Sequence, residues 1–102
     1  MPHIEPLVST LARDPALRPV VARFATGLAA RLEAITTCVT AGDHGRAAEL
    51  AHQLAGAAGM HGFAPIAEAA RGLEHDLRGR DTSAQAGRLD VLHTLCARAR
   101  AD

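Results

Sequence analysis

Apolar residues recur at helical spacing along most of the chain, and this pattern constrains its fold more than any other feature. Between residues 17 and 39 they fall mostly three or four positions apart, so they would line one side of a helix: Leu17, Val20, Val21, Phe24, Leu28, Leu32, Ile35 and Val39. Only Phe24 and Phe63 are aromatic and alanine is abundant, which favours closely packed helices over a sheet of β-branched and aromatic residues. We predict an all-α protein.

Start and stop signals divide the first 60 residues into two helices. Asp14-Pro15 is typical of an N-cap followed by proline in the first turn, and the apolar pattern continues from there to about Ala41. Gly42-Asp43 predicts a helix stop followed by a new N-cap. A second helix should then reach about Met60, with its apolar side formed by Ala47, Leu50, Ala51, Leu54 and Ala58.

The remaining residues predict two more helices. Pro65 fits the first turn of a third helix, which Gly79 would end. The buried side of that helix would consist of Ile66, Ala69, Ala70, Leu73 and Leu77. A fourth helix can be capped by Asp81, Thr82 or Ser83, and its apolar stripe is Leu89, Leu92, Leu95, Cys96 and Ala99.

Short connections between these helices predict an antiparallel up-down four-helix bundle, with a short lead-in helix over residues 5–12. A chain of 102 residues suits one domain, so we expect residues 1–102 to form a single unit whose core bundle covers residues 15–100. Cys38 and Cys96 would then lie at opposite ends of the bundle, on the order of 20 Å apart and beyond disulfide reach. We therefore expect two free thiols.

Charge and hydropathy exclude several classes of protein. Eleven arginines offset eleven acidic residues and are spread from Arg13 to Arg100 without a basic block, so nucleic acid is not an expected partner. No apolar run approaches the roughly 18 residues of a membrane span, and residues 1–5 lack the basic and apolar regions of a signal peptide. We expect a cytoplasmic monomer that does not act at a membrane.

The second predicted helix carries a histidine, His52, on a side otherwise occupied by small residues. At 3.6 residues per turn, Glu49 and five small residues fall on the same side as the imidazole: Gly45, Ala48, Ala55, Gly56 and Gly59. A glycine inside a helix costs up to about 1 kcal/mol relative to alanine, so Gly56 calls for a reason. Close approach of a partner protein to His52 would supply one.

The sequence around His52 resembles the histidine-containing phosphotransfer (HPt) domain family. That family's signature reads His-x-Leu-Lys-Gly-Ser-Ala-Gly, and residues 52–59 here read His-Gln-Leu-Ala-Gly-Ala-Ala-Gly. A Gly-Phe pair at 62–63 and the segment Ala70-Arg71-Gly72-Leu73-Glu74 follow, as they do in the family. The resemblance spans residues 16–100 and agrees with the predicted bundle.

This resemblance implies a phosphorelay intermediate of a bacterial-type two-component system. His52 would accept a phosphoryl group from the aspartate of a response-regulator receiver domain and pass it on, with receiver domains, a hybrid histidine kinase or both as partners. Such a protein has no catalytic turnover of its own and needs no cofactor, because Mg²⁺ is expected on the receiver. Glu49, one turn before His52, could accept a hydrogen bond from Nδ1 and leave Nε2 free.

The sequence departs from the family signature at two positions. Ala55 stands where the signature has lysine, and Ala57 stands where serine is common. The missing ammonium removes a charge that would favour the phosphorylated form, and Arg71 or Arg78 from an adjoining helix could replace it. A second interpretation therefore stays open, namely a bundle of the same fold that is not phosphorylated and regulates by docking a receiver domain or a histidine kinase.

Other kinds of site fit the sequence less well. Cys38, His44 and His75 would lie near one end of the bundle and have side chains that bind zinc, but their spacing matches no compact ligand motif, so we expect no metal site. No phosphate-binding glycine-rich loop and no Ser-His-Asp arrangement suggests an enzyme. The phosphoacceptor helix of sensor kinases is also similar, but that interpretation needs an ATP-binding domain that is missing from this sequence.

Overall fold

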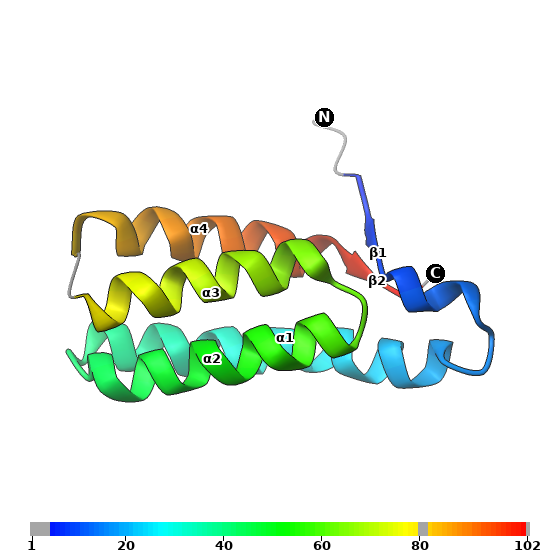
Figure 1. The fold of residues 1–102 in the computed structure, drawn as a ribbon, viewed down its shortest axis with the longest axis horizontal. Helices are drawn as coiled ribbons and strands as arrows, with labels where there is room; N and C mark the ends of the chain where they lie inside the picture. Colours follow the sequence, from blue (N-terminus) through cyan, green and yellow to red (C-terminus); the bar gives the residue numbers. More distant parts are fainter. Residues whose placement is uncertain (1–4, 80–81, 102) are drawn as a thin grey trace.

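The computed structural model describes residues 5–79 and 82–101, and in them four long helices lie lengthwise beside one another (Figure 1). The elements in chain order are β1 (Leu7–Val8), the 3-10 helix η1 (Thr10–Arg13), α1 (Arg18–Thr40), α2 (His44–Met60), α3 (Ala64–Arg78), α4 (Thr82–Arg98) and β2 (Ala99–Arg100). In Figure 1 the chain reverses direction between α1 and α2 and again between α2 and α3. The prediction of a helical bundle is confirmed.

Helix α1 begins later than the sequence suggested. Asp14 does cap a turn, because its Oδ1 accepts a hydrogen bond from the Ala16 N–H at 2.9 Å, but that turn does not continue into the helix. The helix starts at Arg18, with Pro19 in its first turn, where the missing N–H of proline costs nothing. Its end at Thr40 agrees with the prediction.

The boundaries of α2 and α3 lie where the sequence places them. The Asp43 side chain accepts a hydrogen bond from the Arg46 N–H and caps α2. Gly42 and Gly62, in the turns before α2 and α3, have φ angles of 78° and 80°, a conformation that favours glycine. Gly79 is the C-cap of α3, as predicted. Of the caps proposed for α4, Asp81 lies outside the described residues.

The lead-in helix expected over residues 5–12 is wrong in its extent and partly in its type. Strand β1 pairs in parallel with β2, and only η1 is helical. The Ser9 N–H donates to the Arg100 carbonyl at 3.1 Å, and the Thr10 N–H donates to the Gly62 carbonyl at 3.1 Å. These backbone groups bond to distant segments, so they cannot build a local α-helix. The fold is thus helical apart from one short strand pair that joins the two ends of the described chain.

The core fills the space between the helices with small and branched side chains. Helix α2 contributes one leucine and five alanines: Ala47, Ala48, Ala51, Leu54, Ala55 and Ala58. The largest fully buried side chains include Phe63 and residues of the other helices: Leu28, Ile35, Ile66, Leu73, Leu77, Leu92 and Val21. Alanines let helix backbones approach closely, so the buried side of α2 consists mostly of small side chains around the large side chain of Leu54.

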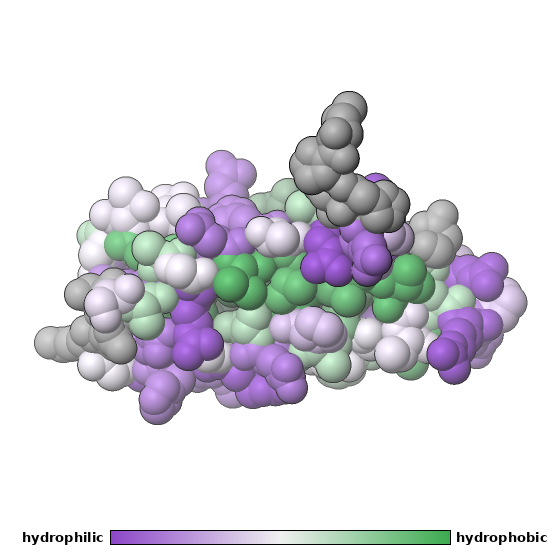
Figure 2. Space-filling model, turned by 90° about the horizontal axis from the view of Figure 1, so that it is seen from above, coloured by the Kyte–Doolittle hydropathy of each residue, from purple (hydrophilic) through white to green (hydrophobic). Residues whose placement is uncertain are grey.

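The cysteines, the hydropathy of the helices and one side of the surface complete the description of the fold. Cys38 is half-buried, Cys96 is buried and both are free thiols, as the predicted topology requires. Among the described residues no helix is long and apolar enough to cross a membrane. Figure 2 shows the molecule from above, on the side of α3 and α4. On this side a band of apolar residues runs along the bundle between hydrophilic patches. Among the exposed large apolar residues is Val91 of α4.

Candidate functional site

His52 projects from the middle of α2 into solvent. Its side chain is 72% exposed, while its chain neighbour Ala51 is completely buried. This contrast follows from helix geometry, because residues adjacent in sequence point about 100° apart around the axis. The core alanines therefore fix the direction in which the imidazole points.

A carboxylate from the neighbouring helix holds one ring nitrogen of His52. Nδ1 lies 3.0 Å from Oε1 of Glu74 on α3. The other carboxylate oxygen, Oε2, accepts a hydrogen bond of 2.9 Å from Nε of Arg78, one turn later on the same helix. Glu74 is only 18% exposed, whereas Arg78 is 55% exposed. Arg78, Glu74 and His52 are therefore linked by two consecutive polar contacts across the α2–α3 interface.

These contacts determine which nitrogen of His52 is available for chemistry. A carboxylate only accepts hydrogen bonds, so Nδ1 must carry the proton that it donates to Glu74. Neutral imidazole has one N–H, and its second nitrogen then keeps a free lone pair. Within the described part of the chain, no residue hydrogen-bonds to Nε2 of His52. The arrangement presents Nε2 to solvent as a nucleophile.

Glu74 is charged under ordinary conditions. Burial alone would raise the pKa of Glu74, but the hydrogen bonds and charges of Arg78 and His52 outweigh burial, and the pKa lies below its ordinary value. The carboxylate is therefore ionised at neutral pH and can accept from both neighbours at once.

The exposed surface beside His52 is lined by glycines. Gly45, Gly56 and Gly59 are exposed, and a Cβ built on Gly45 or Gly56 would meet no atom within 4 Å. No side chain on these positions rises above the helix backbone around the imidazole. A partner surface could approach His52 closely from this direction.

Comparison with known proteins finds one family to which this chain is similar. The family model for the Hpt domain matches residues 19–102, which is most of the chain. The chain belongs to the Hpt domain family. No curated protein and no solved structure matches it. Hpt domains serve histidine phosphotransfer in phosphorelays, and they are phosphotransfer modules rather than true enzymes.

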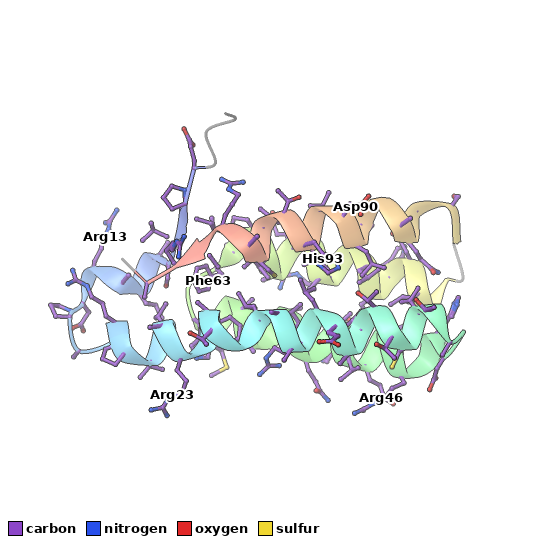
Figure 3. The ribbon with its side chains drawn as sticks, turned by 180° about the vertical axis from the view of Figure 1, so that it is seen from behind. Arg13, Arg23, Arg46, Phe63, Asp90 and His93 are labelled. Atoms are coloured by element: carbon purple, nitrogen blue, oxygen red, sulfur yellow. The ribbon has the colours of Figure 1, made fainter. Side chains whose placement is uncertain are left out.

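One residue expected at the Hpt site does not reach it. Nδ1 of His52 pairs with Glu74 and not with Glu49, whose Oε2 accepts a hydrogen bond of 3.2 Å from Nη1 of Arg46, one turn earlier. Figure 3 shows Arg46 pointing away from the bundle. Sequence reasoning missed Glu74 because it is 22 residues away from His52. The available signal was the Glu74–Arg78 pair at i,i+4 spacing in the helix that follows the histidine.

Two residues expected on the docking surface are buried instead. Ala48 and Ala55 are 1% and 4% exposed, so neither can contact a partner. On a helical wheel they lie at the edge of the His52 side, and packing against the other helices covers this edge. Of the five small residues predicted for docking, only the three glycines remain accessible.

No cationic residue occupies the position of the Hpt signature lysine. Ala55 is a core residue here, and the chain contains no lysine at all. Of the two arginines considered as substitutes, Arg78 is bonded to Glu74 and thus lies one contact from His52, whereas Arg71 is exposed on the same helix.

The described residues contain no group of three or more His, Cys, Asp or Glu that could hold a metal ion, so Cys38, His44 and His75 do not form such a site.

Proposed function

We propose that this Hpt domain is a phosphorelay intermediate in which His52 accepts a phosphoryl group from a receiver aspartate and passes it on. The observation that carries this proposal is the 3.0 Å contact between Nδ1 and Glu74, because in the neutral ring this contact directs the proton to Nδ1 and leaves the lone pair on Nε2 of an exposed side chain. Neutral imidazole is a good nucleophile near pH 7, and the protein need only present it in the right direction.

The transfer needs little chemistry from the bundle itself. The Nε2 lone pair forms a bond to phosphorus while the bond from phosphorus to the aspartate oxygen breaks and its electron pair leaves with the carboxylate. Mg²⁺ and the acid pocket belong to the receiver, so this chain supplies no cofactor of its own. Glu74 acts as a positioning residue, since it holds the ring and its tautomer without touching the phosphoryl group.

The partner that this surface suits is a response-regulator receiver domain, either free or within a hybrid histidine kinase. The exposed glycines Gly45, Gly56 and Gly59 allow a partner backbone to come close to His52, which an in-line transfer between two proteins requires. We place the domain in the cytoplasm as a monomer of one unit, residues 1–102. Nucleic acid and membranes have no part in this function.

Transfer of radioactive phosphate tests the proposal. The protein is mixed with receiver domains from the same organism that carry labelled phosphoaspartate, and the label on the bundle is checked for acid lability and base stability. We expect the wild-type protein to be labelled and His52→Gln to be unlabelled. His75→Gln, which removes another exposed histidine, is the matched control and should still be labelled.

The outcome also separates the alternative function. A wild-type protein that binds a receiver but takes no label would be a docking regulator of the Hpt fold, an alternative that the missing lysine at Ala55 favours. Label retained in His52→Gln would contradict the assignment of His52 as the phosphoacceptor.

A further inference from the structure

The partner of Nδ1 in this site is a charged carboxylate, and this choice has chemical consequences after phosphorylation. A neutral amide at position 74 could also accept the Nδ1–H and fix the tautomer, but it would not favour a positively charged ring. Glu74 is four-fifths buried, and Arg78 fixes its second oxygen at 2.9 Å, so the carboxylate is held against His52. Its charge acts on whatever form the imidazole takes.

Phosphorylation turns the imidazole into such a charged ring. When Nε2 forms its bond to phosphorus and Nδ1 keeps its proton, the ring carries a positive charge. In the next transfer an oxygen of the acceptor, a receiver carboxylate or water, forms a bond to phosphorus while the N–P bond breaks, its electron pair returns to Nε2 and neutral imidazole leaves. If Nδ1 had lost its proton first, the leaving group would be an imidazolate anion, which leaves much less readily. The Nδ1 proton therefore decides how easily the phosphoryl group departs.

We propose that Glu74, held in place by Arg78, keeps the proton on Nδ1 of phosphorylated His52 and so maintains the phosphohistidine in its readily transferred form. This inference rests on the proposed function and deepens it. It implies that the phosphorylated form of His52 is short-lived and that the domain readily donates its phosphoryl group. An ionised hydrogen-bond partner is the strongest kind for a cationic N–H, which is why a carboxylate suits this role.

The other charges around the site support a short-lived carrier. On α2 the nearest charged groups are Arg46 and Glu49, which pair with each other. On α3 they are Glu74 and Arg78, which are also paired, together with the exposed side chains Arg71 and His75. Position 55 is alanine, so within the described residues no lysine ammonium lies beside His52. The site thus holds the cationic ring more firmly than the phosphoryl anion.

The decay of phosphohistidine as a function of pH tests this inference. His52 is loaded with phosphoramidate, a small phosphoryl donor, the donor is removed and the remaining phosphohistidine is followed by ³¹P NMR between about pH 6 and about pH 9. Three proteins are compared: the wild type, Glu74→Gln and Glu68→Gln. Glu68 is exposed on the same helix, so the third protein controls for loss of a carboxylate elsewhere on α3.

We expect the wild-type and Glu68→Gln proteins to lose phosphate at a rate that stays nearly constant to about pH 8. In Glu74→Gln the rate should begin to fall at a pH about one unit lower, and at pH values above both transitions its decay should be up to about tenfold slower, the change that one unit in proton affinity produces. A merely structural role for Glu74 would alter the amount of loaded protein without moving this pH profile.

The two proposals fail in different ways. No phosphohistidine at His52 in any of the proteins would contradict the proposed function itself. Phosphohistidine that forms at His52 but decays with the same pH profile in wild type and Glu74→Gln would leave the proposed function standing and overturn this inference alone.

Discussion

The α2–α3 interface and the α1–α4 interface are built differently, although both join long helices of one bundle. Between α2 and α3, alanines and leucines such as Ala51, Leu54, Ala70 and Leu73 are completely buried. The surface along α1 has two open grooves of about 560 and 600 Å³, the first lined also by the end of α4 and by β2, and the second also by His93 of α4. The α2–α3 interface is thus formed by fully buried side chains, whereas open grooves run along the surface beside α1 and α4.

The polar contacts are also closer across the α2–α3 interface than across the α1–α4 interface. Across α2 and α3 the imidazole of His52 and the carboxylate of Glu74 meet at 3.0 Å, and Arg78 supports them. Across α1 and α4, Thr36 and His93 face each other at 3.4 Å, at the limit of a hydrogen bond. Figure 3 shows His93 between the ribbons of these two helices. The well-packed interface is the one that carries the candidate site.

This difference indicates why the site lies where it does. His52 and its positioning residue come from different helices, so their separation depends on how firmly the two helices are held together. A shift of about 1 Å can cost a large factor in a transfer reaction. Fully buried side chains such as Leu54 and Leu73 hold α2 against α3, whereas open grooves run along the surface beside α1 and α4.

The largest effect should come from removing packing between α2 and α3. Leu54 is fully buried, so Leu54→Ala should lower the free energy of unfolding by about 2–5 kcal/mol through lost burial and the cavity left behind. Urea denaturation measures the change. The control is Val91→Ala on α4, where the side chain is 52% exposed and the loss should stay within about 0.5 kcal/mol. Equal losses in the two variants would contradict burial as the source of the stability that Leu54 contributes.

Whether a feature of the fold could be predicted from the sequence depends on how far apart in the chain the interacting residues lie. Local signals worked for α2, because Asp43 caps a helix through its own neighbours and Gly42 adopts a positive φ within a single turn. The start of α1 was wrong by a few residues, since the Asp14-Pro15 signal is satisfied by a turn that stops before Arg18. The bundle itself was predictable from the apolar spacing.

Contacts between distant segments could not be predicted in this way. Periodicity places Ala55 and Glu49 near His52 on one helix. It does not say that packing in the bundle buries Ala55, or that α3 supplies a different carboxylate, Glu74. The same holds for the strand pair β1–β2, whose partners are separated by more than 90 residues. Only the packing of helices against each other decides such contacts.

A smaller effect should appear when the Glu74 contact is titrated. The folded state lowers the pKa of Glu74, so the contact contributes stability above the unfolded value of about 4.3 and loses it as the pH falls through the lowered folded value. Wild type should be more stable than Glu74→Gln by up to about 1 kcal/mol at about pH 7, because His52 and Arg78 are largely exposed. Urea denaturation of both proteins at about pH 7 and about pH 3 checks whether this difference disappears in acid. A difference that grew in acid would contradict the direction of the pKa shift.

The smallest effect should come from the polar contact across α1 and α4. His93→Ala removes the partner of Thr36, but His93 is exposed and the contact is long, so the free energy of unfolding should change by no more than about 0.5 kcal/mol. Leu92→Ala provides the matched control, since Leu92 is the preceding residue of α4 and fully buried, and its loss should cost about 2–5 kcal/mol. Both values come from urea denaturation under the same conditions. If His93→Ala proved as costly as Leu92→Ala, the α1–α4 interface would depend on this polar contact, and the grooves beside it would not mark a weakly held side of the bundle.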